Sequence, residues 1–327
     1  QASFDLDRVQ RATYEAGLLG TRFSGHDKRV TAGGLLHGSP KRSRQTTGRR
    51  CLHWGPKQKP RGNQFARADR AGAGCAYPGF MSAPTYASVN GLQMYYEVHG
   101  NGPPLVLLHG GALTVGLTFG PMIPALAESH RVIAVEMQGH GHTADIDREM
   151  TLENFADDIV TLLGQLGIEQ ADLFGYSLGG CVSLAIVTRH PNLVGKLVLA
   201  STPTCRRDFA LDGQLDADRM PTAADGQEWE AEYRRIAPHP DRFADLIARA
   251  GVMVGAIEDW SPDGLRAIRA PTLILIGEKD FISIEQAVKT LDLIPDAQLA
   301  ILPGATHVEV TRRPNQVLAM IAPFLDA

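Results

Sequence analysis

The chain has 327 residues, of which 44% are hydrophobic and 21% charged, and this ordinary globular composition excludes disorder along the whole length. Four cysteines at scattered spacings favour neither a disulfide framework nor a zinc site, and no apolar run has the length of a membrane-spanning helix. We therefore expect a globular protein of a reducing compartment, the cytoplasm, that does not contact a membrane.

The net charge of -4 is unevenly distributed along the chain. The residues before Met81 contain 15 Lys and Arg against 5 Asp and Glu, so the remainder carries a net charge of -14. Residues 1–80 show no sustained periodicity and no apolar region of a secretory signal, which predicts a basic arm that is disordered or foreign to the natural protein. Such an arm can bind nucleic acid through charge alone, but no nucleic-acid binding is expected of the folded part.

Residues 81–327 are predicted to form one domain. Asn90-Gly91 lies between the alternating runs TYASV and LQMYYEV, which indicates a hairpin because both turn residues tolerate positive φ. Strand-length apolar runs then alternate with helical patterns. The expected strands are PLVLLHG, RVIAVEM, ADLFGYS, KLVLAST, TLILIG and AQLAIL, with helices near 121–128, 152–166, 178–189, 284–291 and after 314. Successive apolar positions are typical of strands covered on both faces, so we predict the α/β class, with a doubly wound, mostly parallel sheet.

The helix expected after Thr151 has clear end signals. Thr151 can cap its first N–H groups, and Gly167 suits a left-handed stop at its end. Glu153, Asp157 and Asp158 are expected to form a solvated acidic face.

The alternation of strands and helices stops between about residues 203 and 270. QEWEAEYRRI and DRFADLIARAGVMVGAI are amphipathic with a helical period, and no clear strand occurs in this segment. We expect a small helical insertion that caps the domain.

The pentapeptide Gly175-Tyr176-Ser177-Leu178-Gly179 matches the pattern G-x-S-x-G. A sharp turn from strand to helix strains the backbone at the serine, and it requires flanking residues without side chains. The helix behind the serine directs free N–H groups and a partial positive charge at the site. A glycine-lined packing turn gives the same pattern, but the position between a predicted strand and a predicted helix favours a nucleophilic Ser177.

A serine nucleophile needs a base and an orienting acid. His307 follows the late run AQLAILPGATH on a glycine-containing loop, and Asp280 follows the strand TLILIG, with Glu278 as the alternative acid. Taken singly, Asp280 is more simply interpreted as a surface residue and His307 as a residue of a loop. Together, the order Ser177, Asp280, His307 is the chain order of one type of hydrolase, and this favours catalysis.

A reaction at Ser177 also needs donors for a developing oxyanion. The strand PLVLL ends in His109-Gly110-Gly111-Ala112, where bare glycine backbone can approach a substrate oxygen closely. We predict the N–H groups of Gly111 and Leu178 as the oxyanion hole. His109 is expected to fix this loop and not to act as acid or base.

These motifs resemble those of the α/β-hydrolase superfamily, in particular a short esterase-like group with a small helical cap. HGG, GYSLGG, GEKD and PGATH stand where that family carries its oxyanion loop, nucleophile, acid and base, and the resemblance covers residues 81–327. VEMQGHGHT resembles a family loop that usually has Asp and Arg where this chain has Glu136 and Gln138. His140 and His142 in this loop are not expected to bind a metal, because no third ligand pattern lies nearby.

The resemblance implies a serine hydrolase of the carboxylesterase type that cleaves a small ester through an acyl-enzyme. A serine at position 177 argues against haloalkane dehalogenase and epoxide hydrolase chemistry, which uses Asp there. No metal, nucleotide or flavin cofactor is implied. Lactonase, C–C bond hydrolase and cofactor-free haloperoxidase or perhydrolase activities use the same groups and stay open, as does a role as a small-ligand receptor or signalling protein.

The mouth of the site is expected to choose the substrate, a small ester-like molecule. For each candidate residue, plain packing is the competing explanation. The candidates are Phe119, Tyr176, Trp229, Met253 and Trp260. Substrate identity and oligomeric state do not follow from the sequence.

Overall fold

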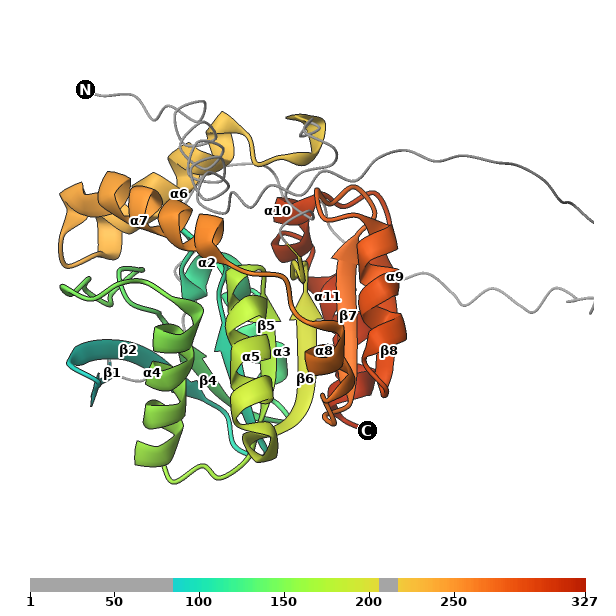
Figure 1. Cartoon of the computed structure of the whole chain (residues 1–327). Helices are drawn as coiled ribbons and strands as arrows, with labels where there is room; N and C mark the ends of the chain where they lie inside the picture. Colours follow the sequence, from blue (N-terminus) through green and yellow to red (C-terminus); the bar gives the residue numbers. More distant parts are fainter. Residues whose placement is uncertain (1–84, 206–216) are drawn as a thin grey trace, which may run out of the picture. The chain divides into compact units, whose positions relative to one another are not determined.

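The structure, a computed structural model, describes residues 85–205 and 217–327, and the predicted basic arm at residues 1–80 lies outside this part of the chain. The centre is an eight-stranded sheet with the order β1-β2-β4-β3-β5-β6-β7-β8 (Figure 1). The strands are β1 (Thr85–Val89), β2 (Leu92–His99), β3 (Pro104–Leu108), β4 (Arg131–Val135), β5 (Ala171–Tyr176), β6 (Val194–Ala200), β7 (Thr272–Gly277) and β8 (Ala297–Leu302). β2 is antiparallel to both neighbours and the other pairs are parallel, which confirms the predicted fold class.

The hairpin that opens the sheet forms at the predicted turn. Asn90 and Gly91 have φ values of 48° and 84°, and Val89 pairs with Leu92 directly across the turn. Two successive positive φ values match the right-handed twist of paired strands, which is why this dipeptide fixes the register.

Helices cover both faces of the sheet. Outside the segment between β6 and β7, they are α2 (Val115–Phe119), α3 (Ile123–Leu126), α4 (Leu152–Gln165), α5 (Leu178–Arg189), α9 (Ile284–Leu293), α10 (His307–Thr311) and α11 (Pro314–Leu325). In β3, Val106 and Leu108 pack with α4 and α5, whereas Leu105 and Leu107 pack in a second core with α2, α3 and α11. All four side chains are fully buried, which explains the continuous apolar run.

The predicted ends of α4 and α5 are close to the observed ones. The Thr151 hydroxyl accepts the N–H of Asn154, and Gly167 has a φ of 67°. Two helices, α2 and α10, were not predicted from the sequence. Each has five residues, which is too few for a helical period to be recognised.

The segment between β6 and β7 is helical in its described part. It contains α6 (Ala223–Ile236), α7 (Phe243–Ala256) and α8 (Pro262–Arg266). In Figure 1, α6 and α7 lie beyond the edge of the sheet toward which the parallel strands point. Thr222 and Asp225 begin α6 with reciprocal side-chain to backbone hydrogen bonds. The bounds of about 203–270 and the capping role stay predictions.

None of the helices within residues 85–205 and 217–327 has both the length and the apolar character that a bilayer crossing demands.

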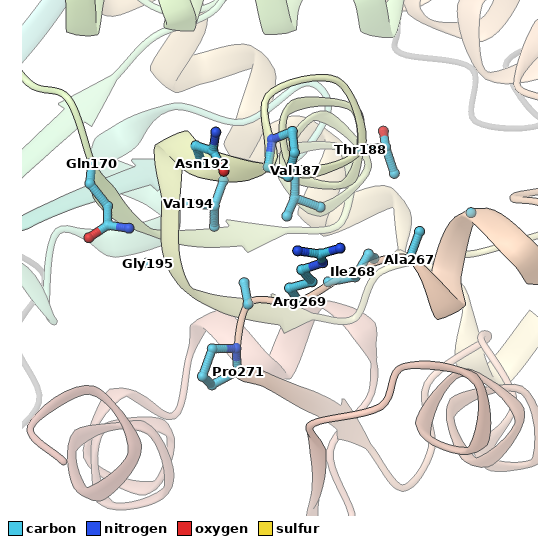
Figure 2. A pocket seen from close by; sticks show the side chains of 13 residues that line it. Gln170, Val187, Thr188, Asn192, Val194, Gly195, Ala267, Ile268, Arg269 and Pro271 are labelled. Atoms are coloured by element: carbon cyan, nitrogen blue, oxygen red, sulfur yellow. The ribbon is translucent and has the colours of Figure 1, made fainter.

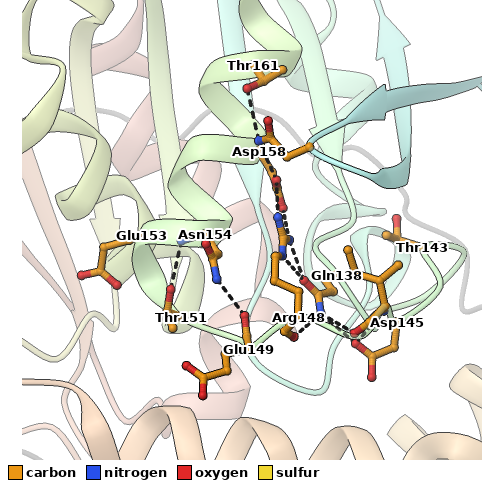
Figure 3. A network of polar contacts seen from close by, with 12 residues as sticks. Gln138, Thr143, Asp145, Arg148, Glu149, Thr151, Glu153, Asn154, Asp158 and Thr161 are labelled. Carbon is orange, nitrogen blue, oxygen red and sulfur yellow. Dashed lines mark hydrogen bonds and ion pairs between the residues drawn. The ribbon is translucent and has the colours of Figure 1, made fainter.

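A buried polar network joins α4 to the loop after β4 (Figure 3). Arg148 donates to both carboxylate oxygens of Asp158, at 2.9 and 2.6 Å, and to Oε1 of Gln138. Asp158 is fully buried and also accepts from Asn90 at 2.9 Å. The expectation of a solvated face was therefore wrong for Asp158, because an arginine from the preceding loop covers and neutralises this carboxylate.

Arg249 connects α7 to the same loop. Its guanidinium donates to the Asp145 carboxylate and to the backbone oxygens of Ile146 and Arg148. This side chain thus links the inserted helix to the loop after β4.

Candidate active site

Ser177 stands at the junction of β5 and α5 in a strained backbone conformation, with a φ of 52° and a ψ of -114°. A Cβ on Gly179 would lie 1.9 Å from the carbonyl oxygen of Leu108, and one on Gly175 would lie 2.3 Å from that of Gly179. The Ser177 N–H donates to Ala200 of β6 at 2.9 Å. Side chains at the two glycines would therefore force the tight turn apart.

His307 lies between Ser177 and Asp280. Its Nε2 is 3.0 Å from Oγ of Ser177, and its Nδ1 is 2.9 Å from Oδ1 of Asp280. The same carboxylate oxygen accepts the N–H of Ile282 at 3.1 Å, and both His307 and Asp280 are buried. With Nδ1 protonated, His307 donates to Asp280 and accepts the Ser177 hydroxyl proton, which is the geometry of a general base.

The local structure around His307 differs from the prediction of a loop. His307 is the first residue of α10, and Thr306 caps this helix in a reciprocal pair of hydrogen bonds with Glu309. The backbone next to the imidazole is therefore held by a defined helix start.

Glu278, the alternative acid, points elsewhere. Its side chain is exposed and accepts the N–H of Gly304 at 2.7 Å. The structure thus pairs His307 with Asp280.

Two aromatic rings lie close to His307. The Phe281 ring lies 4.2 Å from the imidazole between centroids, and the Tyr176 ring lies 5.2 Å away. Sequence reasoning did not find Phe281, and its position directly after Asp280 is the only sequence signal for it. Tyr176 is buried and its hydroxyl donates to the backbone oxygen of His307 at 2.8 Å, and its substrate contact stays a prediction.

The other residues predicted to contact substrate differ in burial. Phe119 is fully buried against Phe174, with ring centroids 5.0 Å apart, and Met253 is buried in the core; substrate contact stays a prediction for both. Trp229 and Trp260 are half-buried, and substrate contact stays a prediction for them. Sequence period does not distinguish a core aromatic from one that lines a site.

The two residues predicted to supply the oxyanion donors are neighbours, and the donor role of their N–H groups stays a prediction. A Cβ on Gly111 would lie 3.7 Å from Cδ2 of Leu178, in ordinary contact. Leu178 is the first residue of α5, and the first N–H groups of a helix have no intrahelical acceptor. Ala112 has a φ of 60°, which is uncommon for a residue with a side chain, so this loop is held in a specific conformation.

His109 supports the loop that carries Gly111. Its Nε2 accepts the N–H of Met137 at 3.1 Å, so the proton resides on Nδ1, which lies 2.8 Å from the backbone oxygen of Gly110. Burial lowers the pKa of His109 to about 3, and the ring is therefore neutral at pH 7. Both nitrogens serve backbone groups, in agreement with the predicted supporting role.

The loop after β4 is organised by the buried carboxylate of Glu136. It accepts the N–H of Val115 at 3.3 Å and the N–H and Nδ1 of His142 at 2.6 and 2.9 Å. The hydrogen bond to Glu136 raises the pKa of His142. His140 instead bonds to the backbone oxygen of Gln138. In the described residues, no three His, Cys, Asp or Glu side chains are grouped to hold a metal ion.

A hollow of about 680 Å³ lies at the edge of the sheet opposite to the one that carries Ser177 and Asp280 (Figure 2). Its lining includes Gln170, Val194 and Pro271, which stand just before or at the first residues of β5, β6 and β7. Ser177 and Asp280 follow the last residues of β5 and β7, at the other edge. This hollow is therefore separate from the candidate active site.

Comparison with known proteins identifies the family. A family model described as alpha/beta hydrolase fold matches residues 103–252. A pyrrolizixenacetamide deacetylase of Xenorhabdus hominickii is 30% identical over 260 residues, which cover 72% of this chain and 96% of that protein. The chain belongs to the α/β-hydrolase fold family.

Two further similarities agree with this assignment. A 2-hydroxymuconate semialdehyde hydrolase of Pseudomonas sp. (strain CF600) is 29% identical over 266 residues, covering 72% of this chain and 91% of that protein. The structure of a thermophilic esterase from Thermogutta terrifontis superposes with a TM-score of 0.62 at 24% identity, over 75% of this chain and 98% of that one, and this likeness concerns the fold. The relatives support a hydrolase activity for this chain.

Proposed function

We propose that the protein is a serine hydrolase that cleaves a small carboxylic ester, with Ser177 as nucleophile, His307 as base and Asp280 as orienting acid. One observation carries this proposal. An unbroken series of hydrogen bonds, of 2.9 and 3.0 Å, runs from the buried Asp280 carboxylate through both imidazole nitrogens to Oγ of Ser177. A buried carboxylate stabilises the imidazolium that forms when His307 takes the hydroxyl proton.

The reaction then follows from the positions of these groups. Ser177 Oγ attacks the ester carbonyl while its proton passes to Nε2 of His307, and the N–H groups of Gly111 and Leu178 stabilise the tetrahedral oxyanion. His307 returns the proton to the leaving alcohol, which leaves an acyl-enzyme. A water molecule then attacks the acyl group while its proton passes to Nε2 of His307. When the bond between Oγ of Ser177 and the acyl carbon breaks, His307 returns this proton to Oγ and the carboxylic acid is released.

The helical insertion is the part that we assign to substrate choice. α6 and α7 lie beyond the sheet edge that carries Ser177 (Figure 1), and Arg249 fixes α7 to the loop after β4. Within this insertion, Trp229 and Trp260 are half-buried aromatic residues that suit contact with a small apolar group.

Hydrolysis of p-nitrophenyl esters of increasing acyl length, together with a lactone, tests the proposal. We expect Ser177→Ala to lower kcat by at least about 1,000-fold, because removal of the nucleophile leaves only the oxyanion donors and binding. Ser88→Ala, which alters an exposed serine on β1, is the matched control and should retain full activity. Ester hydrolysis that persists in Ser177→Ala contradicts the proposal.

Labelling of Ser177 by a fluorophosphonate gives a second readout of the nucleophile that does not depend on the choice of ester. Slow Ser177-dependent turnover with tight ligand retention would instead indicate a small-ligand receptor. Rapid opening of the lactone in preference to the esters would indicate a lactonase.

A further inference from the structure

The hydroxyl of Tyr176 donates to the backbone oxygen of His307 at 2.8 Å, in a fully buried contact that joins β5 to α10. We infer that Tyr176 is a positioning residue, which holds the backbone of His307 at the separation from Ser177 that proton transfer needs. The inference rests on the proposed function, because it assigns a task to Tyr176 within that reaction.

Tyr176 contacts three parts of the site at once. It is bonded directly to Ser177 in the chain, and its hydroxyl holds His307. Its ring also lies under the oxyanion loop, since a Cβ on Gly110 would come within 2.8 Å of the Tyr176 ring. A shift of this one side chain would therefore displace the nucleophile, the base and the oxyanion loop relative to one another.

The hydroxyl of Tyr176 is suited to act as a permanent donor. Burial, with a smaller effect from the charge of Asp280, raises the pKa of Tyr176 well above its ordinary value. The phenol therefore stays protonated at neutral pH. The imidazole also lies near the rings of Tyr176 and Phe281, so the hydrogen bond and the packing constrain the same residue.

Tyr176→Phe tests the inference, because it keeps the ring that packs on Gly110 and removes only the donor. We expect kcat to fall about three- to tenfold with KM within twofold of wild type, since a small displacement of a catalytic base slows chemistry without loss of binding. Tyr95→Phe is the matched control, as Tyr95 is a buried tyrosine of β2 whose hydroxyl donates to Glu97 at 2.7 Å. The control should retain wild-type kcat.

A structural role alone would change stability and leave catalysis intact. If Tyr176→Phe lowers Tm as Tyr95→Phe does and keeps kcat within twofold of wild type, the inference is overturned. The second measurement is the NMR signal of the His307 Nδ1–H proton, assigned by its disappearance in His307→Gln. The signal should shift or broaden in Tyr176→Phe and stay unchanged in Tyr95→Phe.

The NMR measurement separates this inference from the proposed function. If Ser177→Ala retains hydrolysis, the proposed function fails, and the NMR signal alone decides about Tyr176. A changed Nδ1–H signal then supports the positioning of His307 by Tyr176, and an unchanged signal overturns it.

Discussion

Oγ of Ser177 lies 3.0 Å from Nε2 of His307, although 130 positions separate the two residues in the chain. Ser177 follows β5 and His307 follows β8, with β6 and β7 between them in the sheet. Because these strands are parallel, their carboxyl ends meet at one edge, and residues that follow them are brought together there. Asp280, which follows β7, reaches the same edge for the same reason.

The assignment of the acid is tested by Asp280→Asn. We expect kcat to fall about 1,000- to 10,000-fold, because an amide at this position no longer favours the tautomer with Nδ1 protonated and does not stabilise the imidazolium. Glu278→Gln is the matched control, since Glu278 bonds to Gly304 and should not affect kcat. Ester hydrolysis rates of the two variants decide the matter, and a larger loss for Glu278→Gln would reverse the assignment.

The close approach at Gly179 predicts a severe effect of a single methyl group. In Gly179→Ala the new Cβ would meet the backbone oxygen of Leu108, so we expect a loss of at least about 3 kcal/mol in unfolding free energy together with loss of activity. Gly164→Ala is the comparison, because an added Cβ in α4 meets nothing within 4 Å. This variant should gain about 0.5–1 kcal/mol from helix propensity. Urea denaturation measures the unfolding free energy of both variants. Equal changes in Gly179→Ala and Gly164→Ala would refute the explanation by close approach at Gly179.

The buried pair of Arg148 and Asp158 predicts a large stability effect far from the candidate active site. In Arg148→Ala the fully buried carboxylate keeps only Asn90 as a side-chain donor among the bonds described above, so we expect a loss of about 3 kcal/mol. Arg234→Ala removes an exposed pair with Glu230 on α6 and should cost less than about 0.5 kcal/mol. Comparable losses in the two variants would show that burial of Asp158 is not the cause.

The buried histidines predict a loss of stability in acid. Burial lowers the pKa of His140 to about 4 in the folded state, whereas an unfolded histidine has a pKa of about 6.5. The unfolded chain therefore binds a proton more readily than the folded chain. The contribution of His140 to the unfolding free energy is present above pH 6.5 and is lost as the pH falls toward 4. His109, with a pKa of about 3, acts in the same direction.

Urea denaturation at pH 7 and pH 5 checks the direction in which the unfolding free energy changes with pH. Wild type should lose unfolding free energy between the two values, and His140→Gln should lose less, because the substituted side chain does not titrate. An identical pH dependence in the two proteins would contradict the account.

Several features were predictable because they depend on residues close in sequence. The Asn90-Gly91 hairpin, the N-cap of α4 at Thr151 and the turn at Ser177 each follow from the conformational preferences of a few neighbouring residues. The continuous apolar runs likewise indicated strands that are buried on both faces. The sequence therefore determined the fold class and indicated Ser177, Asp280 and His307 as candidate nucleophile, acid and base.

The pairing of these residues was decided by tertiary structure. Local pattern favoured Asp280 but left Glu278 as the alternative acid, and only the packing after β7 directs one toward His307 and the other toward Gly304. In the same way, the Tyr176 hydroxyl is directed to the backbone of His307, and Asp158 is covered by Arg148 of the preceding loop and by Asn90 of the β1–β2 turn. A sequence period records which face of an element is apolar, but a contact across the fold depends on strand order and on the space left by neighbouring elements.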